Sequence, residues 1–206
     1  MPITCRIANE VLPVSQNLRT FVVRYIYFVF DMSKTVPHLS DEEIALRADR
    51  ARELFHQGFN CSQSVFAACA DLYGIDDESL ALRLAASFGG GIGRMRQTCG
   101  AACGMFLLAG LETGSSTPGD HDGKAANYAF VQDLAARFKQ QQGSLICAEL
   151  LGIAPKPQSP TPEPRTEAYY HKRPCADIVA EAVRLYLNAI NEKQLHSSEE
   201  KRNFAG

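Results

Sequence analysis

The stretch Ser87–Gly114, SFGGGIGRMRQTCGAACGMFLLAGLETG, joins a run of glycines to an unbroken apolar segment. Thr98 is a typical N-cap residue, so we expect a helix to begin here with Cys99 at its first position. The Cys99 sulfur would then lie near unpaired backbone N–H groups and the positive end of the helix dipole, where a thiolate is stabilised. The preceding glycines permit positive φ angles and a close approach to another element or a bound group. They are Gly89, Gly90, Gly91 and Gly93.

The composition is that of an ordinary globular domain. The chain has 206 residues, of which 46% are hydrophobic, and a formal charge of −2. This length supports one sizeable core without demanding two domains, and so balanced a charge favours neither nucleic acid nor an anionic membrane as a partner. There are seven cysteines, an odd number, and no secretory signal. We therefore expect a reducing cytoplasm, where cysteines more often serve metal or redox chemistry than structural disulfides.

Residues 1–39 are expected to be an N-terminal extension. The segment Leu18–Phe30 is strongly apolar but contains two arginines, and its 13 residues fall short of the ~20 that a membrane-spanning helix needs. No membrane span is therefore predicted. Met32 opens the part that leads into the first ordinary helix, so we expect translation to begin there and the upstream piece to be extraneous. A strand-like or helical flap is the alternative.

Residues 40–192 are expected to form one helical domain, followed by a polar, frayed tail at 193–206. Capping boxes at Ser40–Glu43 and Asn60–Gln63 start the first two helices. The fold class predicted is all-α, a compact single-domain bundle of about six to seven helices. The expected segments are 41–57, 60–74, 77–88, 99–114, 120–142, 144–152 and 174–191, with an extended loop where five prolines lie between 155 and 164.

Two of these helices carry explicit burial predictions. The helix at 77–88 is expected to bury Leu80, Leu84 and Phe88. The helix at 120–142 is expected to turn Tyr128, Val131, Leu134, Ala135 and Phe138 toward the core.

Four cysteines share one kind of position. Cys61, Cys99, Cys147 and Cys175 each fall in the first turn of a different predicted helix. Core cysteines would fall anywhere along an apolar stripe, as Cys69 does. Helix N-termini favour anionic sulfur by ~0.3–1 kcal/mol each, so we expect the four helices to gather their cysteines into one site. These four residues are the candidate redox-active thiols and the candidate metal ligands.

The segments around these cysteines resemble a known family. They read FNCSQSV, SFGGGIGRMRQTCGAACG, GSLICAELLG and RPCADIV, and they are similar to the C_GCAxxG_C_C family of small redox-active proteins over Glu43–Leu187. The resemblance implies redox chemistry and makes Cys61, Cys99, Cys147 and Cys175 the family's four cysteines. It also implies that Gly100, Ala101 and Gly104 are motif positions. The N-terminal extension and Cys103, at a variable motif position, depart from the pattern.

The glycine run and the motif together supply the positions expected to let the backbone approach a bound cofactor. These positions are Gly90, Gly91, Gly93, Gly100, Ala101 and Gly104. The chain also looks similar to the cysteine domain of split-Soret cytochromes, in which an iron–sulfur cluster accompanies haem. Because the sequence lacks Cys-x-x-Cys-His, no covalent haem is expected.

Three functions remain open from the sequence. In the first, the four thiolates ligate an iron–sulfur cluster, or less favourably Zn²⁺, for electron transfer. The number four supports it, whereas intervals of 38, 48 and 28 residues, without a Cys-x-x-Cys pair, do not. In the second, thiol–disulfide exchange uses Cys99 as nucleophile. In the third, the protein is a non-catalytic helical module that senses metal or redox state. A redox partner of unknown identity and a homodimer are further expectations.

Three cysteines and two arginines remain. Cys5 and Cys69 are interpreted as small core residues, and Cys103 as either a resolving thiol or a buried one. Arg94 and Arg96 either bind an anionic ligand near Cys99, or lower the Cys99 pKa, or are simply solvated.

Overall fold

The computed structural model describes residues 4–7, 10–13, 36–154, 156 and 158–204, with side chains for 36–154, 156 and 158–196. The chain divides into two units, Met1–Lys34 and Thr35–Gly206. In the first unit, β1 (Thr4–Ile7) pairs antiparallel with β2 (Glu10–Pro13). The apolar segment 18–30, the expected start at Met32 and the side chain of Cys5 lie outside the described residues.

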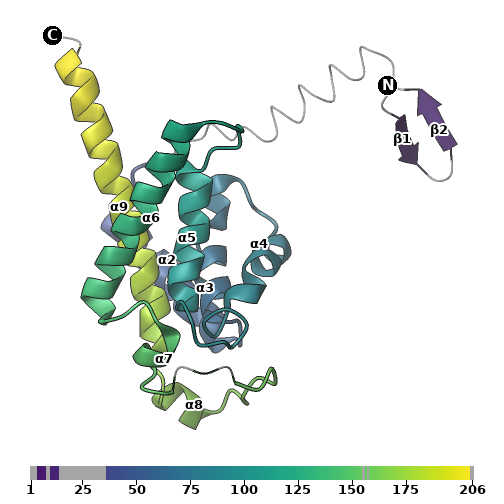
Figure 1. Ribbon diagram of the computed structural model, residues 1–206, viewed down its shortest axis with the longest axis vertical. Coiled ribbons are helices and arrows are strands. Elements are labelled where there is room, and N and C mark those ends of the chain that lie inside the picture. The colour runs from purple at the N-terminus through teal and green to yellow at the C-terminus, as the bar shows by residue number, and fades with distance from the viewer. Residues whose placement is uncertain (1–3, 8–9, 14–35, 155, 157, 205–206) are drawn as a thin grey trace. The chain divides into compact units, whose positions relative to one another are not determined.

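The second unit is an all-α bundle, as predicted (Figure 1). Its described part contains α2 (Asp41–His56), α3 (Cys61–Ala67), α4 (Glu78–Ala85), α5 (Gly100–Thr113), α6 (His121–Gln142), α7 (Cys147–Leu150), α8 (Glu167–His171) and α9 (Cys175–Phe204), with 3-10 turns η1 (Ala70–Tyr73) and η2 (Ala86–Phe88). α5 packs against α3, α6 and α9, while α2 lies along α9. No helix among the described residues is long and apolar enough to cross a membrane.

The two predicted capping boxes set the starts of α2 and α3. Ser40 and Glu43 cap each other's backbone at α2. At α3, Asn60 Oδ1 accepts the N–H groups of Ser62 and Gln63, each at 3.1 Å, and the Gln63 side chain accepts the Asn60 N–H at 3.0 Å. These bonds replace the partners that a helix start lacks. The N-terminal placement of Cys61 on α3 is therefore a local property of the sequence.

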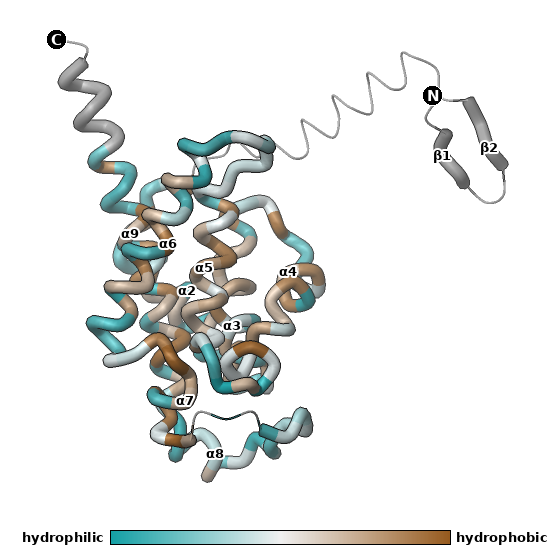
Figure 2. The backbone as a smooth tube through the Cα atoms, viewed as in Figure 1, coloured by the Kyte–Doolittle hydropathy of each residue, from teal (hydrophilic) through white to brown (hydrophobic). Residues whose placement is uncertain are grey.

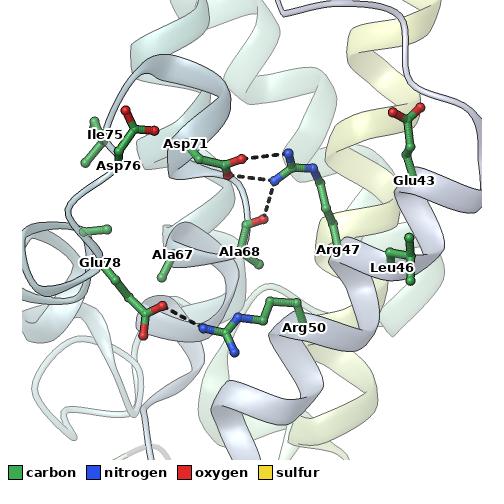
Figure 3. A pocket seen from close by; sticks show the side chains of 11 residues that line it. Glu43, Leu46, Arg47, Arg50, Ala67, Ala68, Asp71, Ile75, Asp76 and Glu78 are labelled. Atoms are coloured by element: carbon green, nitrogen blue, oxygen red, sulfur yellow. Dashed lines mark hydrogen bonds and ion pairs between the residues drawn. The ribbon is translucent and has the colours of Figure 1, made fainter.

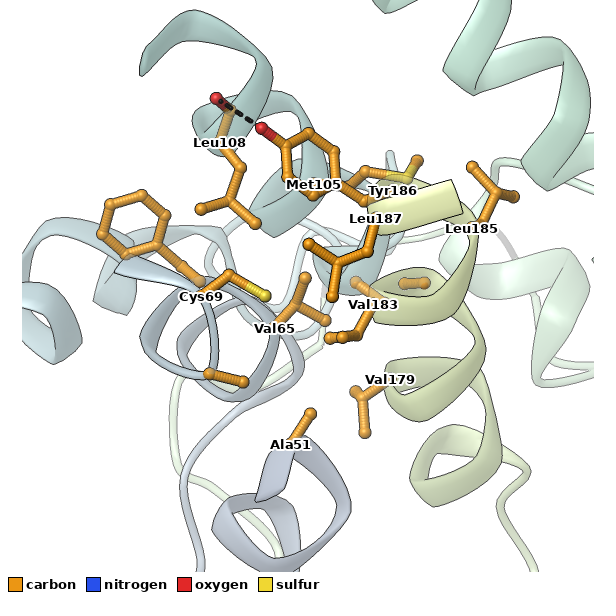
Figure 4. Packing of buried hydrophobic residues seen from close by; sticks show 14 of the residues in the cluster. Ala51, Val65, Cys69, Met105, Leu108, Val179, Val183, Leu185, Tyr186 and Leu187 are labelled. Carbon is orange, nitrogen blue, oxygen red and sulfur yellow. Dashed lines mark hydrogen bonds between the residues drawn. The ribbon is translucent and has the colours of Figure 1, made fainter. Parts of the chain in front are cut away.

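The core lies where α2, α3, α5 and α9 meet (Figure 4). Met105 and Leu108 of α5 and Tyr186 of α9 are fully buried there. The Tyr186 hydroxyl donates to the Leu108 carbonyl at 3.1 Å, which satisfies the one polar group that this ring brings into the core. Cys69 lies among the same aliphatic side chains with 0% exposure. Its interpretation as a core residue is confirmed.

The predicted inner face of α4 is wrong. Leu80 and Leu84 are 39% and 49% exposed, whereas Ala81 and Ala85 are buried; Phe88 is partly buried. The side chains at the start of α3 explain this rotation, since Gln63 donates to the Leu82 carbonyl at 3.1 Å and Asn60 to the Ala86 carbonyl at 2.8 Å. The two leucines are thus left exposed to solvent. Figure 2 shows that α4 contains hydrophobic residues.

The predicted face of α6 is also partly wrong. Leu134 and Phe138 are buried as expected, Val131 and Ala135 are partly buried, and Tyr128 is 59% exposed. Asn127 takes the inward position instead, because its amide donates to the Ala109 carbonyl at 3.2 Å and to Thr113 Oγ1 at 2.8 Å. The adjacent Tyr128 is thereby turned outward.

The C-terminal part differs from the prediction in two places. α9 does not end near residue 191 but continues to Phe204. Polar side chains tie its middle to the bundle: Asn191 exchanges bonds with the Leu39 backbone at 3.0 and 2.7 Å, and Lys193 donates to Glu112 at 2.9 Å. A short helix that was not predicted, α8, is capped by Thr166, whose hydroxyl accepts from the Tyr169 N–H at 3.3 Å.

Candidate functional site

The loop before α5 is built from left-handed backbone. Gly90, Gly91 and Gly93 have φ angles of 64°, 72° and 56°, as the glycine run predicted. Three residues with side chains, Ile92, Arg94 and Arg96, share this conformation at 60°, 65° and 62°. Such a backbone costs roughly 1–2 kcal/mol per residue outside glycine, so the surrounding contacts must compensate for it.

Cys99 lies one position earlier than expected. α5 begins at Gly100, which makes Cys99 the N-cap residue and corrects the prediction of Thr98 in that role. Thr98 instead pairs with Ile146 in an isolated antiparallel bridge. Two backbone bonds flank this bridge, from the Cys99 N–H to the Leu145 carbonyl and from the Cys147 N–H to the Gln97 carbonyl, each at 2.7 Å. The bridge therefore brings the segment of Cys147 beside that of Cys99.

Three glycines bring further parts of the chain close together. A Cβ at Gly91 would lie 2.6 Å from the Cys147 Cβ, and one at Gly100 would lie 3.2 Å from the Cys61 Cβ. A Cβ at Gly104 would meet the Val65 Cβ at 2.9 Å. The close approach expected of these glycines is thus made by other segments of the protein. Cofactor binding along the glycine and Ala101 backbone stays a prediction.

Cys61 at the start of α3 and Cys175 at the start of α9 form a pair. Both residues are partly buried, and each thiol is the largest influence on the pKa of the other. Cys61 lowers the pKa of Cys175, and the guanidinium groups of Arg173, Arg165 and Arg96 act in the same direction against burial. Cys175 and burial raise the pKa of Cys61. Of the two sulfurs, the thiolate is therefore favoured at Cys175.

Cys99 and Cys147 are more deeply buried, at 6% and 7% exposure. Burial raises the pKa of Cys99 to about 12, although the N–H groups of Ala101 and Ala102 favour its thiolate. Burial also raises the pKa of Cys147, against the influence of Arg96. Cys99 was expected to be the activated nucleophile; desolvation outweighs the helix terminus there, so Cys175 is the better candidate.

The structure brings the four candidate cysteines together. The charges of Cys99, Cys147 and Cys175 all act on the pKa of Cys61, and those of Cys147 and Cys175 act on that of Cys99. Cys103 is buried beside them, with Sγ 3.8 Å from the Thr98 carbonyl, and burial raises its pKa to about 11. Cys103 therefore fits its interpretation as a buried thiol.

Arg96 is the most unusual charged group of the site. It is 2% exposed, which contradicts its interpretation as a solvated side chain. Its Nη1 lies 3.8 Å from Cys147 Sγ, and its Nε donates to Gln158 Oε1 at 3.0 Å. A buried guanidinium needs partners of this kind, because an uncompensated buried charge is costly.

A strap of residues 158–165 overlaps the predicted proline-rich loop and ends one residue beyond it; arginines near the cysteines, and Arg165 of the strap itself, hold it in place. Arg94 donates to the Ser159 carbonyl at 2.7 Å, and Arg173 pairs with Glu163 at 2.9 Å. Arg165 donates to the carbonyls of Phe55 and Phe59 at 3.3 and 3.2 Å. Sequence reasoning missed the roles of Gln158, Glu163, Arg165 and Arg173; the position of Arg173 two residues before Cys175 was the available signal.

The arginines of the site outnumber its carboxylates. Arg94, Arg96, Arg165 and Arg173 all surround the cysteines or the strap, and Glu163 is the one carboxylate paired with any of them among the described residues. An excess of positive charge therefore lies beside the sulfurs. Such an excess favours thiolates and other anions.

The arrangement of the side chains bears on whether the site could bind a metal. Among the described residues, no three His, Cys, Asp or Glu side chains are grouped so that they could hold a metal ion. The number and type of ligands expected for a cluster are present in the four cysteines, but they are not arranged as a ligand set.

A separate cavity of about 440 Å³ lies between α2 and the segments from α3 to α4 (Figure 3). The described residues that line it include no cysteine. Arg47 donates to both oxygens of Asp71 at 2.7 and 2.8 Å, and Arg50 donates to Glu78 at 2.7 Å. Each arginine of this groove thus has its own carboxylate.

The comparisons with known proteins agree with the cysteine pattern. The family model described as "Putative redox-active protein (C_GCAxxG_C_C)" matches residues 59–189, which is more than half of the chain. No curated protein and no solved structure shows a significant match. The matched region includes all four first-turn cysteines and the arginine-bound strap. The chain therefore belongs to the C_GCAxxG_C_C family of redox-active proteins.

Proposed function

We propose that this protein exchanges electrons through a dithiol–disulfide pair formed by Cys175 and Cys61. The strong mutual influence of these two neighbouring thiols carries the proposal. They are also the two partly exposed members of the four, whereas Cys99 and Cys147 are buried. To form a disulfide, the two sulfurs must approach to the S–S length of ~2.05 Å.

The proposed reaction begins at Cys175. Its thiolate attacks a disulfide R–S–S–R, so that the substrate S–S bond breaks, a Cys175–S–S–R bond forms and one RS⁻ leaves. Cys61 then loses its proton to the departing thiolate and attacks the Cys175 sulfur, which releases the second RS⁻. The protein gains the Cys61–Cys175 disulfide, and two electrons have passed to the substrate. The arginines near Cys175 stabilise the attacking thiolate.

A single-turnover experiment tests this assignment. Reduced protein, freed of reductant without air, is mixed with bis(2-hydroxyethyl) disulfide, and its cysteine links are mapped by peptide mass spectrometry. We expect a Cys61–Cys175 link, and in Cys61→Ser we expect a trapped mixed disulfide at Cys175. Cys69→Ala, in the core away from the pair, should react as the parent does. A first adduct on Cys99, or no link between Cys61 and Cys175, would overturn the assignment.

An iron–sulfur cluster held by Cys61, Cys99, Cys147 and Cys175 is the second candidate function. The mutual electrostatic influence of the four thiols favours it, because four thiolates complete such a site. The lack of a metal-ligand arrangement among the described side chains places it behind dithiol exchange, and Zn²⁺ is subject to the same objection. Iron and sulfide analysis of anaerobically purified protein decides the point: stoichiometric iron and sulfide would put the cluster first.

The remaining expectations stay predictions. They are a non-catalytic sensing module, a homodimer, a redox partner of unknown identity, no binding of nucleic acid and a cytoplasmic location. Loss of partner binding without loss of disulfide exchange in a cysteine variant would favour the sensing module.

A further inference from the structure

The arginines around the cysteine pair are not equally engaged. Arg96 is buried and shared between Gln158 and Cys147. Arg165 is held by two backbone carbonyls and lies over the rings of Phe55 and Tyr169, at 4.6 and 4.9 Å from their centroids. Both guanidinium groups are therefore committed to the fold. Neither is free to receive an additional anion.

Arg94 and Arg173 are placed differently, although Arg173 also lies over the Tyr169 ring, at 4.6 Å from its centroid. Both pair with the same carboxylate, Glu163, at 3.6 and 2.9 Å. Their side chains keep 20% and 15% exposure, while Glu163 itself is 45% exposed. One carboxylate neutralises only one of two cations, so this triad carries a net positive charge that solvent or a ligand can reach.

This positive charge lies close to the reacting sulfur. Arg173 precedes Cys175 by two residues and favours the Cys175 thiolate electrostatically. Arg94 belongs to the left-handed loop before α5 and donates to the strap at Ser159. An anion between Arg94 and Arg173 would therefore be held next to the Cys61–Cys175 pair. Guanidinium forks bind carboxylates in two-point geometry, which would fix the orientation of such a ligand.

We propose, on the basis of the exchange function above, that the substrate is an anionic disulfide whose carboxylate or similar group binds between Arg94 and Arg173. The substrate accepts two electrons in the same two exchange steps, and its acidic groups pass unchanged into the two thiol products. The paired cations offset the repulsion that an anionic substrate would otherwise meet at the Cys175 thiolate. Substrate recognition and thiolate stabilisation thus use the same excess of charge.

A series of disulfides with equal two-carbon arms tests the proposal. The probes are 3,3′-dithiodipropionate, bis(2-hydroxyethyl) disulfide and cystamine, which are anionic, neutral and cationic. Formation of the Cys61–Cys175 disulfide is followed under single-turnover conditions in the full chain. We expect the anionic probe to react about tenfold faster than the neutral one, with cystamine the slowest, and the order to collapse at high salt.

Variants separate recognition from activation of the thiolate. Arg94→Gln and Arg173→Gln should each bring the ratio of the anionic-probe rate to the neutral-probe rate down to about one, whatever either variant does to the neutral-probe rate itself. Arg50→Gln, in the distant groove, should keep the preference. Equal slowing of all three probes in Arg173→Gln would assign that arginine to the thiolate alone and overturn the proposal.

If an arginine variant does not fold, the rates of the three probes with the parent protein still test the proposal. Equal rates for the three probes with the parent protein would refute the anionic substrate class while the exchange function stands. No reaction with any of the three would refute the exchange function itself.

Discussion

Two regions of the molecule contain arginines: the groove between α2 and α4, and the cysteine site. They differ in how many carboxylates are available to neutralise each arginine. In the groove, Arg47 has Asp71 and Arg50 has Glu78. At the cysteine site, Arg94 and Arg173 share the carboxylate of Glu163, and Arg96 and Arg165 have no carboxylate partner among the described residues. Paired surface charges contribute little beyond solubility and local packing. An uncompensated excess is costly unless another anion uses it, and this is why we propose chemistry at the cysteine site and none in the groove.

Backbone conformation separates the same two regions. Gly74 ends η1 beside the groove with φ 74°, and open space surrounds the position of its missing Cβ. Gly91 has nearly the same φ, 72°, but lies directly against Cys147. The left-handed turn at Gly74 thus only ends a helix. The one at Gly91 also places a cysteine.

The largest difference between the two regions should be the effect of a substitution on the rate of disulfide reduction. We expect Cys175→Ser to lower the rate of single-turnover disulfide reduction by on the order of 10³-fold or more, equivalent to about 4 kcal/mol, because a hydroxyl cannot replace the thiolate. Arg50→Gln in the groove should leave the rate unchanged. Thiol release measured by absorbance checks both variants, and retained activity in Cys175→Ser would remove the distinction.

The close contact at Gly91 should make its replacement more destabilising than that of Gly74. We expect Gly91→Ala to lower the free energy of unfolding by about 3 kcal/mol, from backbone strain together with overpacking against Cys147. Gly74→Ala should cost about 1 kcal/mol, from the left-handed backbone alone. Urea unfolding followed by circular dichroism measures both values. Equal costs would mean that the contact between Gly91 and Cys147 contributes nothing.

Replacement of the buried Arg96 should destabilise the fold more than replacement of the exposed Arg50. We expect Arg96→Gln to cost about 2 kcal/mol of unfolding free energy, since Gln158 loses its charged partner inside the protein. Arg50→Gln removes an exposed ion pair and should cost about 0.5 kcal/mol or less. The same unfolding experiment applies to both variants. A small effect at Arg96 would show that water replaces the guanidinium.

The smallest predicted effect is a difference in the pH dependence of alkylation. Since the pKa of Cys175 is lowered, its alkylation rate should rise with pH and level off below the ordinary thiol value of ~8.5. By linkage, this thiolate stabilises the fold above the unfolded-state pKa, and that contribution is lost as pH falls through the lowered value. Burial raises the pKa of Cys69 to about 12, so Cys69 should remain unreactive throughout this range. Mass spectrometry after timed iodoacetamide treatment measures each site, and parallel profiles would contradict the assignment of the charge to Cys175.

The helix starts were predictable because they depend on neighbours in the chain. Ser40 with Glu43 and Asn60 with Gln63 are satisfied within one turn, so their pattern predicts α2 and α3 directly. Errors arose where distant side chains decided the outcome. The helical periodicity of α4 is compatible with burying either the face of Leu80 and Leu84 or the face of Ala81 and Ala85. The bonds from Asn60 and Gln63 turn the two leucines outward.

The candidate site divides in the same way. The sequence by itself determined that four cysteines stand at or next to helix starts, and that glycines precede one of them, since caps and left-handed turns are local features. Only the tertiary structure decided that Cys175 acts on Cys61, across 114 residues. It also decided that Arg94 and Arg173 pair with the same glutamate. The physical reason is that burial and charge depend on what packs nearby in space. Burial raises the pKa of Cys99 in spite of the helix terminus, while Cys61 and the surrounding guanidinium groups lower the pKa of Cys175.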